Sequence, residues 1–66
     1  MKLTYNSSPE VVQFYLKKAK LTQIELANRL NVSANAISKA IKKEIGMNVL
    51  RGKIVDIITD VIKRAA

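Results

Sequence analysis

Apolar residues recur along residues 22–42 at the spacing of two short helices joined by a tight turn. The residues on the two inner faces are Leu26, Ala27 and Leu30 on the first helix and Ile37, Ala40 and Ile41 on the second, with Val32 in the turn. Because each helix is apolar on one side only, the two inner faces can share one core. The pattern therefore predicts helices over about residues 23–30 and 34–43.

The residues at the ends of these two helices agree with the apolar pattern. Thr22 and Glu25 have the spacing of a capping box, and Ser33 is a favourable N-cap for the second helix. Asn31 tolerates the left-handed backbone conformation that such a turn usually needs. These end signals support the two helices independently of hydrophobicity.

Residues 7–10, Ser-Ser-Pro-Glu, predict the start of an earlier helix that ends near Lys20. Either Ser7 or Ser8 is its N-cap, and proline suits its first turn. Its buried stripe is Val11, Val12, Tyr15, Leu16 and Ala19. Phe14 lies off this stripe, where it either covers the edge of the core or contacts another molecule.

A fourth helix is predicted from about Lys53 to Arg64. Its broad apolar face is Ile54, Ile57, Ile58, Val61, Ile62 and Ala65. The polar residues at 56, 59, 60 and 63 follow a helical period and not the alternation of a strand, and Asp60 can pair with Arg64 one turn later. Residues 44–52 contain two glycines and predict a loop, and residues 1–6 are either a short edge strand or an arm.

The composition excludes several classes of function. The 66 residues contain no cysteine and no histidine, which excludes a zinc finger and nucleophilic Cys/His chemistry. No carboxylate pair or nucleophile–base set stands out, so we expect no enzyme, and no cofactor, metal or small-molecule ligand is implied. No apolar run approaches the ~20 residues that span a bilayer. We expect a single domain over residues 1–66 and a cytoplasmic location.

The formal net charge is +7, and it is concentrated in the part of the chain that holds the paired helices. Residues 1–43 carry eight basic residues against two acidic ones, whereas residues 44–66 carry four against three. This imbalance predicts a polyanionic partner.

The paired helices resemble the helix-turn-helix of the lambda-repressor and Cro-like family of phage and bacterial transcriptional regulators. The residues that carry the resemblance are LTQ at 21–23, ELA at 25–27, Leu30, NVS at 31–33 and ISK at 37–39. Two positions depart from it: Asn31 replaces the commoner glycine, and Ala40 is smaller than the usual residue. The resemblance implies an all-α domain of four to five helices with a central helix-turn-helix. It also implies a Cro-like repressor that occupies a double-stranded DNA operator, near the nucleoid of a bacterial host.

One face of the second helix of the motif is polar and basic. Its members Asn35, Ser38, Lys39 and Lys42 are spaced i, i+3, i+4 and i+7. Amide, hydroxyl and cationic side chains can read base edges in the major groove, and an alanine methyl can contact thymine. The positions that match or adjoin the family's base-reading sites are Ser33, Ala34, Asn35, Ser38 and Lys39.

Further residues are candidates for binding DNA phosphates. Gln23 matches the family position at the N-terminus of the first motif helix that contacts the backbone. The other candidates are Arg29, Lys42, Lys43, Lys17, Lys18 and Lys20. They cannot all face one duplex, and Arg29 could instead pair with Glu25.

Because one short recognition helix reads few base pairs, family members usually bind inverted repeats as dimers. We therefore expect a weak homodimer. Candidate dimer contacts are Ile58, Val61, Ile62 and Ala65 on the outer edge of the last helix, although this helix could simply fold back over its own domain. The alternative function is a protein-interaction module, such as an antirepressor or small antitoxin, which uses the C-terminal helix to bind a partner.

Overall fold

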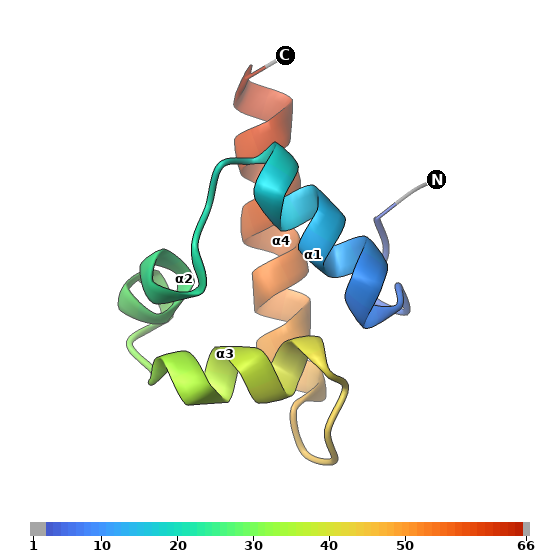
Figure 1. The fold of residues 1–66 in the computed structure, drawn as a ribbon, viewed down its shortest axis with the longest axis vertical. Helices are drawn as coiled ribbons and strands as arrows, with labels where there is room; N and C mark the ends of the chain where they lie inside the picture. The colour runs from blue at the N-terminus through green and yellow to red at the C-terminus, as the bar shows by residue number, and fades with distance from the viewer. Residues whose placement is uncertain (1–2, 66) are drawn as a thin grey trace.

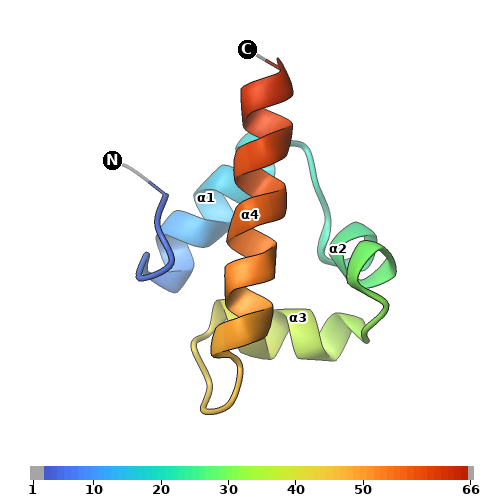
Figure 2. The ribbon, with the colours of Figure 1, turned by 180° about the vertical axis from the view of Figure 1, so that it is seen from behind.

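The computed structural model describes residues 3–65, and within them the fold is all-helical, as the sequence predicts. The helices are α1 (Pro9–Lys18), α2 (Gln23–Leu30), α3 (Ala34–Ile41) and α4 (Asn48–Ala65). Helix α4 runs along the long axis of the molecule, and α1, α2 and α3 lie on one side of it (Figure 1). The view from behind shows the other side of α4 uncovered (Figure 2).

The core lies between α4 and the other three helices. Its most deeply buried side chains are Val12, Leu26, Ile37, Ile41, Ile54 and Ile58. They come from all four helices, so the apolar stripes predicted from the sequence do meet in one core. Ala40 is also fully buried, and α4 packs closely against α3. The small side chain at position 40 is therefore compatible with the close approach of the long helix.

The N-caps of α1, α2 and α3 are serines and a threonine, as the sequence predicts. Ser8 caps α1 and accepts a hydrogen bond from the Val11 N–H at 3.4 Å. Ser7, the other candidate, is instead a buried side chain whose Oγ accepts a hydrogen bond from the Thr4 N–H at 2.8 Å. Ser8 and not Ser7 is therefore the N-cap of α1, because the Ser7 side chain is hydrogen-bonded within the segment before the helix.

The first three helices end in the same way, with a residue in the left-handed conformation. These residues are Lys20, Asn31 and Lys43, with φ of 57°, 56° and 62°. After each, a backbone N–H bonds back into the last turn: Leu21 to the Leu16 carbonyl, Val32 to Ala27 and Glu44 to Lys39. This is the Schellman arrangement, which stops a helix and turns the chain sharply. Helix α3 consequently ends at Ile41, two residues before the end that the sequence predicted.

The prediction of a loop over residues 44–52 is wrong for its second half, because α4 begins at Asn48 and not near Lys53. Met47 and Leu50 are half-buried against the core, which gives the early turns an apolar contact. Gly52, whose presence argued against a helix, faces the Tyr5 ring, and a Cβ atom there would lie 3.6 Å from it. Tertiary contacts of this kind override the low helix propensity of glycine.

The segment before α1 is an arm and not a strand over its described residues, 3–8. A turn in it is closed by a hydrogen bond from the Ser7 N–H to the Thr4 carbonyl. The Tyr5 hydroxyl donates to Asp56 Oδ1 at 2.6 Å, and Arg51 Nε donates to the Tyr5 carbonyl at 3.1 Å. The hydrogen bond to Asp56 and the negative charge of that carboxylate raise the pKa of Tyr5 above 10.0. Met1, at the start of the predicted strand or arm, lies outside the described residues.

Candidate nucleic-acid interface

The helices α2 and α3 form a helix-turn-helix whose turn is fixed by local hydrogen bonds. Asn31 adopts φ 56° and ψ 45°, as the sequence predicts for this position. The Val32 N–H then donates to the Ala27 carbonyl at 3.0 Å, and Ser33 caps α3 by accepting from the Ala36 N–H at 3.1 Å. Every residue from the end of α2 to the start of α3 therefore has a defined backbone role, which sets the direction of α3.

The inner side of α3 is buried and its outer side is exposed. Ile37 and Ala40 are 0% exposed, whereas Asn35 and Lys39 are exposed and Ser38 is half-buried. None of the side chains of these three polar residues has a hydrogen-bond partner within residues 3–65. The packing of the apolar side holds the helix in place while its amide, hydroxyl and ammonium groups stay available to another molecule.

The N-terminal end of α3 is also exposed. Ser33 and Ala34 both lie at the surface, next to Asn35. The Ser33 oxygen accepts the capping bond from Ala36, and its hydroxyl hydrogen remains able to donate. The predicted base-reading residues thus lie between the N-cap of α3 and Lys39, and all of them except the half-buried Ser38 are exposed.

The N-terminus of α2 presents Gln23, which is half-buried and is the first residue of that helix. Thr22 caps the helix by accepting from the Glu25 N–H at 3.1 Å, and its hydroxyl lies 3.5 Å from Glu25 Oε1. The capping-box spacing is therefore used, although the carboxylate meets the hydroxyl and not the backbone N–H of Thr22. The backbone N–H groups of the first turn of a helix favour an anion such as a phosphate.

The basic residues around the motif differ in how they are engaged. Lys42 is exposed, and its side chain has no hydrogen bond or ion pair within the described residues. Lys43 Nζ donates to the Asn6 carbonyl at 2.8 Å. Arg29 forms no ion pair with Glu25 in the described part of the chain, which leaves its guanidinium available. Among these three basic residues around the motif, Lys42 and Arg29 thus have side chains without a protein partner within residues 3–65, which leaves them available to bind phosphates.

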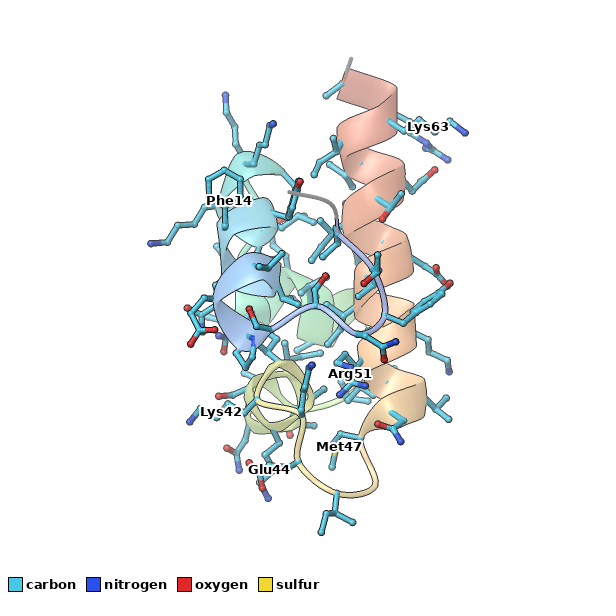
Figure 3. All side chains as sticks on the ribbon, turned by 90° about the vertical axis from the view of Figure 1, so that its right-hand side faces the viewer. Phe14, Lys42, Glu44, Met47, Arg51 and Lys63 are labelled. Atoms are coloured by element: carbon cyan, nitrogen blue, oxygen red, sulfur yellow. The ribbon has the colours of Figure 1, made fainter. Side chains whose placement is uncertain are left out.

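The bond from Lys43 to Asn6 ties the end of α3 to the arm, and the arm is tied to α4 through Arg51. Arg51 also donates to Asn48 Oδ1 at 3.2 Å, at the start of α4. Sequence reasoning missed Tyr5 and Arg51 as residues that position the motif, because they lie far apart in the chain and carry no local pattern. Figure 3 shows Arg51 between the arm and the first turns of α4.

Comparison with known families supports the interpretation of this geometry. Residues 10–43, just over half of the chain, match the family described as winged helix-turn-helix DNA-binding. The chain belongs to this winged helix-turn-helix family. No curated protein and no solved structure matches the chain. The protein is therefore a helix-turn-helix DNA-binding protein, and double-stranded DNA is its partner.

The matched part of this helix-turn-helix protein includes α2 and α3 whole, begins within α1 and stops before α4. Residues 3–65 contain no strand, so no β-hairpin wing follows the matched helices there. None of the described helices is both long and apolar enough to cross a membrane. The family match supports the motif itself and not the narrower Cro-like type.

The lysines at the end of α1 lie away from α3, the second helix of the motif. The end of α1 lies in the half of the molecule that holds the C-terminus and α3 crosses the other half (Figure 1), along a longest extent of 32 Å. Lys18 Nζ sits 5.9 Å from the centre of the Tyr15 ring, a cation–π contact. The structure therefore separates Lys17, Lys18 and Lys20 from Lys42 and the α3 face.

Phe14, which the sequence placed off the buried stripe of α1, is half-exposed. Its ring meets the Tyr15 ring edge-on, with centroids 5.3 Å apart. Phe14 thus contacts a partly buried aromatic residue while half of it remains at the surface, and its role stays a prediction.

The candidate dimer contacts on α4 do not form one surface. Ile58 is 0% exposed and belongs to the core, so its assignment to a dimer contact is wrong. Val61 and Ile62 are half-buried and Ala65 is exposed. The helical period places all four residues on one side of α4, but α1 and α3 pack over Ile58, whereas the last turn of α4 extends past them (Figure 1).

Proposed function

We propose that this helix-turn-helix protein is a Cro-like repressor that occupies a DNA operator by placing α3 in the major groove. The observation that carries the proposal is the outer side of α3, where exposed amide and cationic side chains have no partner within the described residues. The resemblance of residues 21–39 to the lambda-repressor family supports it further. We also propose that residues 1–66 act as one domain.

Specific roles follow from the chemistry of each side chain. Asn35 is suited to two hydrogen bonds with adenine, and Lys39 to donation to guanine. Ala34, at the N-terminal end that would enter the groove first, is suited to contact with a thymine methyl. Ser33 and Ser38 are proposed to supplement these contacts with hydroxyl hydrogen bonds.

The phosphate contacts are proposed to flank α3. Gln23 lies at the start of α2, where free N–H groups favour phosphate, and Lys42 follows the end of α3. Arg29 and Lys43 supply further positive charge at the same end. Contacts of this kind position the protein and give most of the salt-dependent affinity, whereas base contacts give the sequence preference.

The operator is proposed to be an inverted repeat that holds two copies of the protein. The α3 helix has only 8 residues, so one copy reads few base pairs. A weak homodimer, formed mainly when two copies bind neighbouring half-sites, would double the number of bases read. The proposed site of action is the nucleoid of a bacterial cell, with the operator beside a promoter.

Selection of bound duplexes from a random DNA pool tests the proposal. We expect the selected duplexes to share an inverted repeat, and the affinity for them to fall steeply with salt because several phosphates are neutralised. An enriched single half-site would contradict the inverted repeat alone. Failure to bind any duplex at low salt, or a binding constant that does not change with salt, would contradict the proposal as a whole.

A further inference from the structure

A hollow of about 440 Å³ lies between the end of α1 and the last turns of α4. It is lined by Lys18, Ala19 and Lys20 from the α1 side and by Val61, Ile62 and Ala65 from α4. One wall therefore carries two ammonium groups and the other wall is aliphatic. The elements that line it, the end of α1 and the last turns of α4, lie on the C-terminal side of the molecule, away from α3 (Figure 1).

The charge around the hollow is of one sign. Both ionisable residues in its lining are lysines, and no carboxylate belongs to it. Asp60, the residue directly before Val61, forms an ion pair with Arg64 at 3.1 Å. The hollow thus offers aliphatic contacts beside two lysines that no carboxylate of the lining neutralises, although the Lys18 ammonium also lies over the Tyr15 ring.

This combination distinguishes between the molecules that could occupy the hollow. If a second copy bound here across a two-fold axis, Lys18 and Lys20 of both subunits would meet in one interface, where their like charges repel. A DNA backbone would satisfy the lysines but would leave Val61 and Ile62 without apolar contacts. A protein segment that carries both carboxylates and aliphatic side chains satisfies both walls.

We propose that this hollow docks an acidic amphipathic helix of a partner protein. Its aliphatic side chains would pack on Val61, Ile62 and Ala65, and its Asp or Glu residues would pair with Lys18 and Lys20. A groove between two helices suits such a ligand, because helices pack with their axes about 8–10 Å apart. The inference is independent of the operator proposal, since the site shares no residue with the outer face of α3.

Titration of the isotope-labelled protein by NMR tests this docking site. The probe is a synthetic helical peptide with leucine along one face and glutamate elsewhere. We expect saturable shifts of the amide signals of residues 18–20 and 61–65, with a dissociation constant below about 1 mM. A peptide of the same pattern with lysine in place of glutamate, and an acidic peptide without leucine, should leave these signals unchanged.

Charge-reversal variants provide the matched control. Lys18→Glu should weaken binding of the acidic peptide about three- to ten-fold. Lys63→Glu makes the same change of charge on α4, but Lys63 points away from α1 (Figure 3), so it should retain the affinity of the parent protein. Circular dichroism of both variants tests whether they fold. Lys20→Gly is a third variant that removes a charge with little risk of misfolding, because glycine suits the left-handed backbone at position 20.

Several outcomes would overturn the proposal. Peptide-induced shifts that map to α3 would indicate general attraction to a basic protein. Equal weakening of peptide binding by Lys18→Glu and Lys63→Glu would indicate the same. Concentration-dependent shifts of residues 61–65 without peptide would show that a second copy is the occupant. Saturable shifts of residues 18–20 on addition of duplex DNA would show that these lysines bind DNA phosphates and not a partner protein.

Discussion

The two ends of this molecule are both basic, yet their surfaces differ. At one end, α3 exposes Asn35 and Lys39, with Ser38 half-buried, and the only fully exposed aliphatic group among them on this helix is the small methyl of Ala34. At the other end, Lys18 and Lys20 border an aliphatic hollow. The comparison teaches that positive charge alone does not specify a partner. Neighbouring donors and acceptors suit base edges, whereas neighbouring aliphatic side chains suit another protein.

The two ends also differ in how they are held by the core. Ile37, Ala40 and Ile41 of α3 are all at most 1% exposed, so the inner side of that helix is completely packed. In α4, burial decreases along the helix from Ile58 at 0% to the half-buried Ile62. A fully packed helix presents its outer face in one fixed orientation. The last turn of α4, in contrast, has apolar surface that the other helices do not cover.

The largest expected effect separates the core of α4 from its outer edge. Ile58→Ala should lower the free energy of unfolding by about 2–5 kcal/mol, because it leaves a cavity in a fully buried site. That is a large share of the about 3–10 kcal/mol expected for a chain of this length. Denaturation followed by circular dichroism measures the change.

Ile62→Ala makes the same change one turn later and should cost under about 1 kcal/mol, because this half-buried side chain buries less apolar area. Equal losses in the two variants would mean that the end of α4 is packed as tightly as its middle. In that case the comparison between a packed and an open region of α4 would not hold.

The next effect tests the recognition end. Asn35→Ala and Lys39→Ala should each lower the affinity for the selected operator by about 1–3 kcal/mol and should affect non-specific binding much less. Gln23→Ala should weaken binding to all sequences alike, as expected of a phosphate contact. Competition between operator and random duplex measures both affinities. An unchanged ratio of specific to non-specific binding in Asn35→Ala would remove that residue from the reading face.

Local signals predicted the fold around α2 and α3 well, because caps and turns depend on neighbouring residues. Thr22, Ser33 and the left-handed Asn31 all lie within a few residues of the bonds that they make. The start of α4 was not predicted, since Arg51 and Asp56 are joined to Tyr5 across 46 and 51 residues of sequence. No periodicity in a single sequence encodes such contacts.

The candidate interface was predictable to a similar extent. The helical period identified the outer face of α3, because a buried stripe implies an exposed one. It could not divide the lysines between the two ends of the molecule, since that depends on where α1 lies relative to α3. The same limitation made Ile58 and Ile62 look equivalent, although only the packing of α1 and α3 distinguishes them.

A smaller effect tests whether the two basic ends have different partners. Each lysine bound to a phosphate contributes about one unit to the slope of log affinity against log salt. Lys42→Gln, beside α3, should reduce that slope by about one, and Lys18→Gln, at the hollow, should leave it unchanged. Binding of a random duplex measured at several salt concentrations gives both slopes. A reduced slope in Lys18→Gln would show that DNA contacts both ends.

The smallest effect concerns the left-handed residues that follow α1 and α2. Lys20 has φ 57°, a conformation that costs a residue with a Cβ about 1–2 kcal/mol and costs glycine almost nothing. Glycine also has more freedom in the unfolded chain, which offsets about 0.4–1 kcal/mol of that gain. Lys20→Gly should therefore raise the free energy of unfolding by up to about 1 kcal/mol. Asn31→Gly is the matched control, because asparagine already tolerates this backbone conformation and less is gained there. Parallel urea denaturation of the two variants compares them, and a larger gain at Asn31 than at Lys20 would contradict the argument from backbone strain.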